Sequence, residues 1–269
     1  EDTRAITWVG VGHHADVAYL SLTRGDGGQN LIGDELGDAL GVIRTEELLA
    51  ARRIDGAHQY FTRAYDFGFS KTSAESFAHW PHDAVLHDVV TVVRAFRPQV
   101  IVSVFSGTPR DGHGQHQVAG IVAREAYDAA MDTVRFPRAS TAGYGPWTPL
   151  KFYRTRSYWG GEGATLTYNA GAYDPLLGAS YAEIAAESRS QHKSQGFGML
   201  ARLGAQTGSV RLEGSRVRTA ARPGAERSMF DGIDTTWRRL ASEVSRPADR
   251  AAVERLAAVQ AQLRHLKDT

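Results

Sequence analysis

Apolar residues along this chain follow two patterns: short continuous runs, and longer stretches in which they recur every three or four positions. The short runs, rich in Val, Ile and aromatic residues, predict strands, and the longer stretches predict amphipathic helices. Strands are expected at Ile6 to Val9, Val17 to Thr23, Gln59 to Phe67, Val100 to Phe105, Leu150 to Thr155, Ala164 to Tyr168 and Ser209 to Val217. Helices are expected at Asp38 to Arg53, Ala84 to Phe96, His116 to Met131, Tyr181 to Lys193 and Ala248 to Leu266.

The order of these elements predicts the fold class. Strands that alternate with helices are typical of an α/β fold with a mostly parallel, doubly wound, Rossmann-like sheet flanked by helices. We expect residues 1–200 to form the main domain. Residues 201–269 are expected to complete or extend it as a smaller α+β extension made of a strand and helices.

Composition excludes several classes of function. The 31 basic and 30 acidic residues nearly cancel, and no basic block suited to a nucleic acid backbone is present. No apolar run approaches the roughly 18 residues of a membrane span. The chain has no cysteine, which excludes disulfides, thiolate metal sites and a cysteine nucleophile. No signal-peptide pattern is visible, and the sequence leaves open whether this is a cytoplasmic or an exported bacterial protein. The oligomeric state is also left open.

Two histidines form the most informative local feature. The segment Asp111-Gly112-His113-Gly114-Gln115-His116-Gln117 follows the Val100 to Phe105 run and precedes a helical pattern. Active sites of open α/β sheets form where strands hand over to helices, and imidazoles three residues apart point to one side of a helix. Because neutral imidazole is a common zinc ligand, the pair predicts part of a metal site. The alternative is a pair of histidines that cap a loop.

A glycine motif near the start of the chain is weaker. Gly10 to Ala15 matches the dinucleotide fingerprint G-x-G-x-x-G/A. That fingerprint functions only where a helix follows and binds the pyrophosphate at its N-terminus. Here a strand pattern follows directly, which disfavours nucleotide binding.

The same stretch is short for a connection between parallel strands. A parallel crossover needs about a dozen residues or more, and only Gly10 to Asp16 separates the first two expected strands. Either these strands form an antiparallel hairpin, or a helix-bearing segment is absent between Val11 and His13. We favour the absent segment.

Five landmarks in fixed order carry a family resemblance. They are Leu22 to Gly28, Arg44 to Glu47, Tyr65 to Gly68, the pair His113 and His116, and His192 to Gln195. Between Val17 and about Thr155, with weaker support to about Gly196, the chain resembles the zinc-dependent N-acetylglucosaminyl deacetylases of the PIG-L / LmbE-like family. The resemblance implies an LmbE-like fold. Asp26 stands where the family has a glutamate.

One family motif is missing from this sequence. Relatives carry His-Pro-Asp-Asp after their first strand, where it supplies two metal ligands and the catalytic base. The resemblance therefore implies that the remaining His and Asp ligands and the Asp base lie in the segment expected between Val11 and His13. His13, His14 and Asp16 could substitute, but we interpret them as the turn that enters the next strand.

The resemblance also implies roles for the residues present. His116 would be a ligand of Zn²⁺, or of another divalent metal. His113 would stabilise the oxyanion and protonate the leaving amine. Arg44 and Asp66 would bind the substrate, although Arg44 could instead form an ordinary i, i+3 surface pair with Glu47.

Two further residues are possible members of the site. Asp111 could be the carboxylate partner of His113, because Gln115 stands where many relatives have Asp. His192 would be either a pocket residue or a helix-packing residue. Three aromatic residues could stack on a sugar face but more often pack in cores or loops: Trp147, Tyr158 and Trp159.

The resemblance implies a metal-dependent hydrolase that removes the acetyl group from an N-acetylated sugar or glycoconjugate. The sequence leaves two alternatives open. One is an amide hydrolase for a non-sugar N-acyl substrate. The other is a catalytically inactive carbohydrate-binding relative.

Overall fold

The computed structural model describes residues 2–156, 163–198, 200–217 and 226–267. Its helices are α1 (Thr3–Gly10), α2 (Asp38–Asp55), α3 (Ser73–His79), α4 (His82–Phe96), α5 (Gly114–Ala129), α6 (Tyr181–Arg189), α7 (Trp237–Glu243) and α8 (Pro247–Lys267). Its strands are β1 (Ala18–Ser21), β2 (His58–Phe61), β3 (Val100–Ser103), β4 (Lys151–Thr155), β5 (Leu166–Asn169), β6 (Tyr173–Asp174), β7 (Ala179–Ser180) and β8 (Thr207–Ser215). Short 3-10 helices lie at η1 (Pro109–Asp111) and η3 (Lys193–Gln195).

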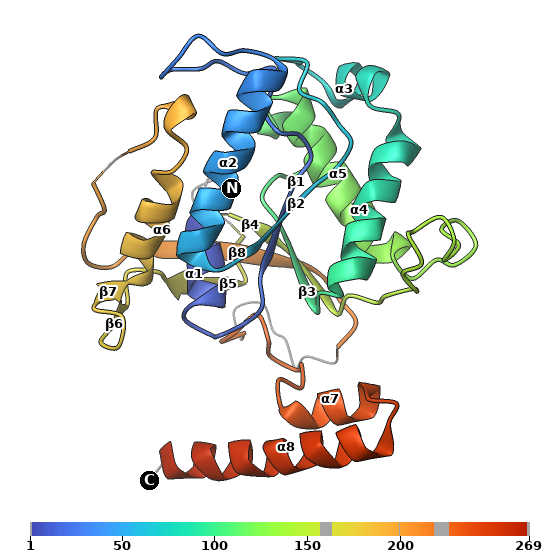
Figure 1. Cartoon of the computed structure of the whole chain (residues 1–269), viewed down its shortest axis with the longest axis vertical. Coiled ribbons are helices and arrows are strands. Elements are labelled where there is room, and N and C mark those ends of the chain that lie inside the picture. The colour runs from blue at the N-terminus through green and yellow to red at the C-terminus, as the bar shows by residue number, and fades with distance from the viewer. Residues whose placement is uncertain (1, 157–162, 199, 218–225, 268–269) are drawn as a thin grey trace.

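The strands form an α/β fold with mixed pairing. β1 and β2 pair in parallel as one sheet, and β3-β4-β8-β5 form another in which only β3 and β4 are parallel. β8 runs antiparallel to both β4 and β5. Figure 1 shows α4 and α5 on one side of the strands, and α1, α2 and α6 on the other. β8, which the sequence placed in the C-terminal extension, therefore lies inside the main sheet.

The strand expected at Ile6 to Val9 is wrong, because this segment lies within α1. The Asp2 side chain caps the helix by accepting a hydrogen bond from the Ala5 amide (3.3 Å). The Thr7 hydroxyl donates to the Tyr181 carbonyl (2.9 Å), which fixes α1 against α6. A short apolar run does not distinguish a buried strand from one face of a short helix.

This correction removes the reason for placing absent residues between Val11 and His13. The amides of Val11 and Gly12 donate to the Thr7 carbonyl, and the His13 amide donates to Val9. The chain therefore passes from α1 through a tight turn into β1. Because α1 is a helix, this stretch does not connect two strands, and the length required for a parallel crossover does not apply.

Most other expected elements are confirmed with shifted ends. α2 ends at Gly56, whose left-handed backbone is the usual helix C-cap geometry. The strand expected from Gln59 to Phe67 ends at Phe61, and the helix expected to reach Lys193 ends at Arg189. The sequence reasoning missed α3, α7 and the short β6–β7 pair.

Two hydrophobic clusters cover opposite faces of β3. One, between α4 and α5, contains Leu86, Val90 and Val118 and contacts Ile101. The other contains Tyr153 and Val210 among its buried residues and contacts Val100 and Val102. Because successive strand residues point to opposite faces, β3 is covered on both sides, as expected for an α/β layer.

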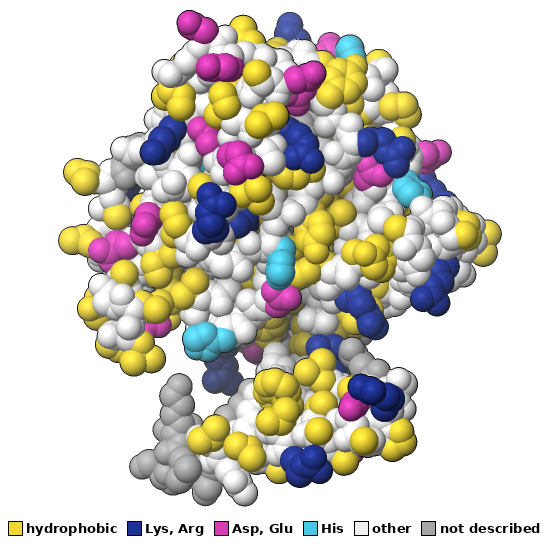
Figure 2. Space-filling model, in the orientation of Figure 1, with side chains coloured by type: hydrophobic (Ala, Val, Ile, Leu, Met, Phe, Trp, Pro, Cys, Tyr) yellow, Lys and Arg dark blue, Asp and Glu magenta, His cyan; other side chains and the backbone are white. Residues whose placement is uncertain are grey.

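The α7–α8 pair projects from the rest of the chain (Figure 1). Figure 2 shows hydrophobic side chains gathered on its visible face. No helix among the described residues has the length and apolar character needed to cross a membrane.

Candidate functional site

The loops that follow β1, β2 and β3 meet at one edge of the molecule. The Asp66 amide, after β2, donates to the Asp26 carboxylate, after β1 (3.1 Å). The Gln115 side-chain amide, at the start of α5, donates to Asp66 Oδ1 (3.0 Å) and to the Gly68 carbonyl (2.8 Å). This edge opens into a cavity of about 1640 Å³ whose lining includes His113. These residues therefore lie at the carboxyl ends of parallel strands, where active sites of open α/β sheets form.

Local backbone geometry places His113 at the start of α5. Gly112 adopts a positive φ of 73°, which glycine tolerates without strain, and the chain turns there into the helix. His113 is the N-cap, and its Nδ1 accepts the Gln115 amide hydrogen (3.1 Å). In the neutral ring, this hydrogen bond assigns the proton to Nε2. His113 therefore presents a proton donor.

His116 has the opposite arrangement of ring nitrogens. Its ring stacks on Phe105 at 4.0 Å between centroids, and its Nδ1 lies 3.4 Å from the Asp111 carbonyl oxygen. A carbonyl only accepts, so this contact assigns the proton to Nδ1 and leaves the Nε2 lone pair as the donor atom. An imidazole backed by a backbone carbonyl is the usual form of a histidine metal ligand.

The two rings lie side by side, with centroids 5.0 Å apart. Burial lowers the pKa of His113, and the nearby Asp66 carboxylate partly opposes this effect. Burial also lowers the pKa of His116, with the Asp111 carbonyl opposing. Both rings are therefore neutral at pH 7, as a ligand and a proton donor require.

Asp111 stabilises the loop after β3, and its carboxylate has no described contact with the His113 ring. Its side chain is buried, and its oxygens accept the backbone amides of Ser106 (2.9 Å), Gly107 (2.7 Å) and Thr108 (3.2 Å). The carboxylate that acts on His113 is Asp66. The sequence analysis missed this interaction because it noted Gln115 only as a replacement for Asp. In the structure, the Gln115 side chain links Asp66 to the start of α5.

Arg44 holds the loop after β1. Its guanidinium donates to the carbonyls of Gly25 (2.8 Å) and Gln29 (2.7 Å), while its buried Nε has no hydrogen-bond partner. Burial lowers the pKa of Arg44, and Asp66 is the first of three carboxylates that oppose this. Glu47 binds the Ser194 amide (2.6 Å) and hydroxyl (2.7 Å) instead of forming a hydrogen bond with Arg44. The simple surface pair is therefore not the arrangement observed.

His192 and His13 lie in other parts of the cavity wall. His192 is 6% exposed and lines the cavity together with Gln195 and Phe197. His13 contacts the Trp8 ring at the far end of α1 (4.4 Å between centroids). As expected, His13 and His14 belong to the turn that enters β1, and no helix follows the glycine motif there.

Among the aromatic candidates, Trp147 has a packing role. Its indole N–H donates to the Pro98 carbonyl (2.7 Å), and the Arg97 guanidinium lies over its ring (4.4 Å). Tyr158 and Trp159 lie outside the described residues.

The described residues do not complete a metal centre. No group of three or more His, Cys, Asp or Glu side chains within this part of the chain is placed to hold a metal ion. His116 fits the role of one ligand, through its Nε2 atom. Catalytic zinc usually takes three protein ligands, so the site as described is partial.

Sequence comparison places these residues in a family. Residues 9–127 match the PIG-L model, described as GlcNAc-PI de-N-acetylase. A 1D-myo-inositol 2-acetamido-2-deoxy-alpha-D-glucopyranoside deacetylase from Rhodococcus opacus (strain B4) is 32% identical over 157 residues, covering 52% of this chain and 51% of the relative. An enzyme of the same name from Geodermatophilus obscurus is 35% identical over 159 residues, covering 53% and 52%. The chain spans about half the length of these curated relatives.

Solved structures show the same fold. The N,N'-diacetylchitobiose deacetylase from Pyrococcus horikoshii has a TM-score of 0.54 at 16% identity, covering 72% of this chain and 64% of that one. The 4-carboxy-2-hydroxymuconate hydratase GalB from Pseudomonas putida KT2440 has a TM-score of 0.53 at 15% identity, covering 82% and 93%. The resemblance found in the sequence is confirmed: the segment from residue 9 to residue 127 matches the PIG-L family model.

Proposed function

We propose that this protein hydrolyses the acetamide of an N-acetylated amino sugar or glycoconjugate and releases acetate and a free amine. The observation that carries this proposal is the unequal pair at the cavity edge. His113 presents an N–H, and His116 presents a lone pair. Amide hydrolysis needs a proton donor for the leaving amine, and the two rings are near enough to act on one substrate.

Different residues of the chain would bind the substrate and transfer the proton. Arg44 and Asp66 line the same cavity as His113. A guanidinium and a carboxylate are suited to a hydroxyl-rich ligand, since one donates and the other accepts hydrogen bonds. His113, through Nε2–H, would deliver the proton to the departing nitrogen, and Asp66 would stabilise the charged form of the ring.

The proposed cofactor is Zn²⁺, with His116 as one ligand. When bound in such sites, zinc lowers the pKa of its water toward about 7. Because the described residues provide one fitted ligand rather than three, they do not account for that part of the chemistry. We also propose that the sheet is of the mostly parallel, Rossmann-like kind, which the parallel pairs β1–β2 and β3–β4 support.

The relatives suggest the substrate class. The two curated relatives are named for a 2-acetamido-2-deoxyglucopyranoside of inositol, and one structural neighbour is named for a diacetylated chitobiose. Both names contain an acetamide on a glucosamine ring. We therefore propose a glucosamine-type acetamide for this protein as well.

A second candidate, a carbohydrate-binding protein without turnover, is favoured by one observation. The described residues include no set of three metal donors. Acetate release separates the two candidates. The protein, supplied with Zn²⁺, is incubated with the N-acetylglucosaminyl inositol, with N,N'-diacetylchitobiose and with N-acetyllysine.

Acetate and amine released in equal amounts from a sugar substrate, and less from N-acetyllysine, is the expected result. Acetate release from N-acetyllysine alone would show that the substrate is a non-sugar N-acyl compound. Sugar binding by calorimetry without acetate release, even with zinc present, would contradict hydrolysis and leave the binding function.

A further inference from the structure

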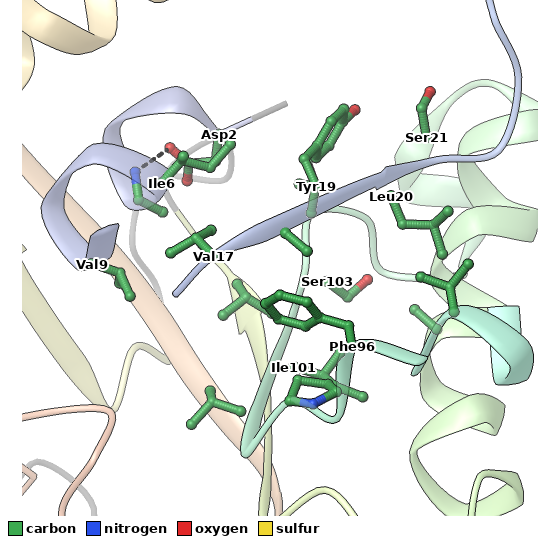
Figure 3. Close-up of a pocket in the computed structure, with 18 of the residues that line it drawn as sticks. Asp2, Ile6, Val9, Val17, Tyr19, Leu20, Ser21, Phe96, Ile101 and Ser103 are labelled. Atoms are coloured by element: carbon green, nitrogen blue, oxygen red, sulfur yellow. Dashed lines mark hydrogen bonds between the residues drawn. The ribbon is translucent and has the colours of Figure 1, made fainter. Parts of the chain in front are cut away.

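Polar residues that can orient a ligand are gathered at one end of the cavity. Between β1 and β3, apolar side chains such as Leu20 and Ile101 line the cavity (Figure 3). At the carboxyl edge, the lining includes Asp66, His113 and Gln115. Recognition of a polar ligand depends on a small number of precisely placed polar groups. Binding at this edge therefore depends on what holds these three side chains in place.

Gln115 contacts both of the other residues. It is the second residue of α5, after the N-cap His113, and its backbone amide donates to His113 Nδ1 (3.1 Å). Its side-chain Nε2 donates to Asp66 Oδ1 (3.0 Å) and to the Gly68 carbonyl (2.8 Å). A carbonyl only accepts hydrogen bonds, so the atom beside Gly68 is the amide nitrogen and not the amide oxygen. Gln115 therefore joins the ring of His113 to the carboxylate of Asp66.

The carboxylate of Asp66 is held through one oxygen only. Oδ1 accepts hydrogen bonds from Gln115 and from the Gly68 amide (2.9 Å). Oδ2 has no hydrogen-bond partner among the described residues, and it is not one of the buried atoms without a partner, so it is open to solvent. An ionised carboxylate accepts hydrogen bonds at both oxygens. Oδ2 is therefore the oxygen that Asp66 offers to a ligand in the cavity.

The backbone of Asp66 has little freedom to move. Its amide donates to Asp26 (3.1 Å), and its carbonyl lies so close to Gly27 that a Cβ there would clash with it. The remaining freedom is rotation of the Asp66 side chain, which the two donors on Oδ1 oppose. One of them, Gly68, belongs to the same loop as Asp66. Gln115 is thus the donor that ties the direction of the carboxylate to α5.

A second glutamine of the same helix shows what a contact with a structural role alone looks like. Gln117 is 4% exposed, and its Oε1 accepts the Ser73 amide hydrogen (3.1 Å) while its Nε2 donates to the Lys71 carbonyl (2.9 Å). Both ends of this amide bind backbone outside the cavity lining. Gln115, in contrast, lines the cavity and binds a carboxylate there. The two side chains join α5 to the same segment but act on different parts of it.

We propose that Gln115 is a positioning residue: it fixes the Asp66 carboxylate relative to His113, with Oδ2 directed to the substrate. The role in binding a sugar rests on the proposed function, whereas the contacts of Gln115 do not. A hydroxyl of the proposed sugar donates to Oδ2 while the acetamide lies against His113. Without the Gln115 donor the carboxylate can rotate, and a misplacement of about 1 Å is enough to lower activity about 100-fold.

A double-mutant cycle tests whether Gln115 acts through Asp66. Gln115→Leu removes both side-chain donors at similar size, and it is combined with Asp66→Ala. Calorimetry measures the binding of N-acetylglucosamine without added zinc, and acetate release with zinc gives kcat/KM. We expect each single variant to weaken both quantities by about 10-fold or more, and the double variant to be no weaker than Asp66→Ala alone. Gln115→Glu, which keeps the length but has no side-chain donor, should behave like Gln115→Leu.

Losses that multiply in the double variant would overturn the proposal, because Gln115 would then act independently of Asp66. Gln117→Leu is the matched control. It should lower the urea midpoint of unfolding and leave sugar binding unchanged, since its contacts lie outside the cavity lining. Sugar binding weakened equally by Gln117→Leu and Gln115→Leu would reduce Gln115 to a structural residue and would also overturn the proposal.

The urea midpoints test the contact itself without a sugar. Gln115→Leu and Asp66→Ala should together lower the midpoint by less than the sum of their separate effects, whereas Gln117→Leu and Asp66→Ala should add. Additive midpoints for the first pair would overturn the proposal even if the protein releases acetate. Absence of acetate release, with coupled sugar binding and coupled midpoints, would refute the hydrolase and support the positioning role of Gln115.

Discussion

The two ends of the cavity differ in chemistry although they share one wall. At the carboxyl edge, polar side chains bind one another and the loops: Arg44 holds Gly25 and Gln29, and Gln115 holds Asp66. Between β1 and β3, the same cavity is lined by Val and Leu side chains. The first arrangement is suited to a small polar ligand, whereas the second is mostly apolar. One continuous cavity thus contains two regions of different chemistry.

The largest expected effect separates the two histidines at the polar end. His113→Ala should lower kcat by about 10²–10⁴, the usual contribution of a positioned acid, while zinc content stays unchanged. His116→Ala should lose zinc as well as activity, because its Nε2 atom is the proposed ligand. Zinc content by elemental analysis and kcat by acetate release check both variants.

His58→Ala is the matched control, since His58 does not line the cavity and pairs with the Asp16 carboxylate (2.9 Å); the change should affect neither quantity. Equal zinc loss in His113→Ala and His116→Ala would show that the two roles are assigned wrongly.

The next effect compares the cavity wall between β1 and β3 with the hydrophobic core. Leu86 is fully buried, so Leu86→Ala should lower the free energy of unfolding by about 2–5 kcal/mol. Val102 is only half-buried, so Val102→Ala in residues 1–269 should cost less than half as much. Urea denaturation measures both. Equal losses would mean that Val102 is packed as a core residue and does not line an open cavity.

A smaller effect concerns the loop that Arg44 holds. Arg44→Lys removes the forked hydrogen bonds to Gly25 and Gln29, because an ammonium does not reproduce the guanidinium geometry. We expect KM to rise about 10-fold, equivalent to about 1.4 kcal/mol, with kcat changed less. Arg53→Lys, on the exposed end of the same helix, is the control. A fall in kcat with KM unchanged would place Arg44 in the chemical step instead.

The smallest expected effect concerns the Arg63–Asp88 ion pair, which does not line the cavity. It gives the size of effect to expect from a change away from the site. Burial raises the pKa of Asp88, but hydrogen bonds from Arg63 outweigh this and hold it below its usual value. A carboxyl whose pKa is lower in the folded state stabilises the protein above its unfolded pKa of about 3.9 and loses this contribution as pH falls through the folded pKa. Asp88→Asn should therefore cost up to about 1 kcal/mol at pH 7. The difference from wild type should vanish in strong acid, as followed by thermal unfolding, and a difference that persists at low pH would point to lost packing.

Local sequence patterns predicted the polar end of the cavity better than the rest of it. The spacing of His113 and His116, together with the preceding strand and following helix, placed the pair correctly. The contact of Gln115 with Asp66 joins residues 49 positions apart, which no local pattern encodes. The Ile6 to Val9 run was assigned to a strand because short apolar runs fit either element. A cavity between two sheets is a property of tertiary arrangement and has no local sequence signal.

Anomalous diffraction at the zinc edge, from crystals of the native-source protein grown with Zn²⁺, tests the central claim most directly. We predict one anomalous peak within coordination distance of His116 Nε2, with His113 outside the coordination sphere and additional ligands from residues beyond those described. A peak bound by both His113 and His116, or no peak at this edge, would contradict the unequal roles of the pair and the partial site on which the account depends.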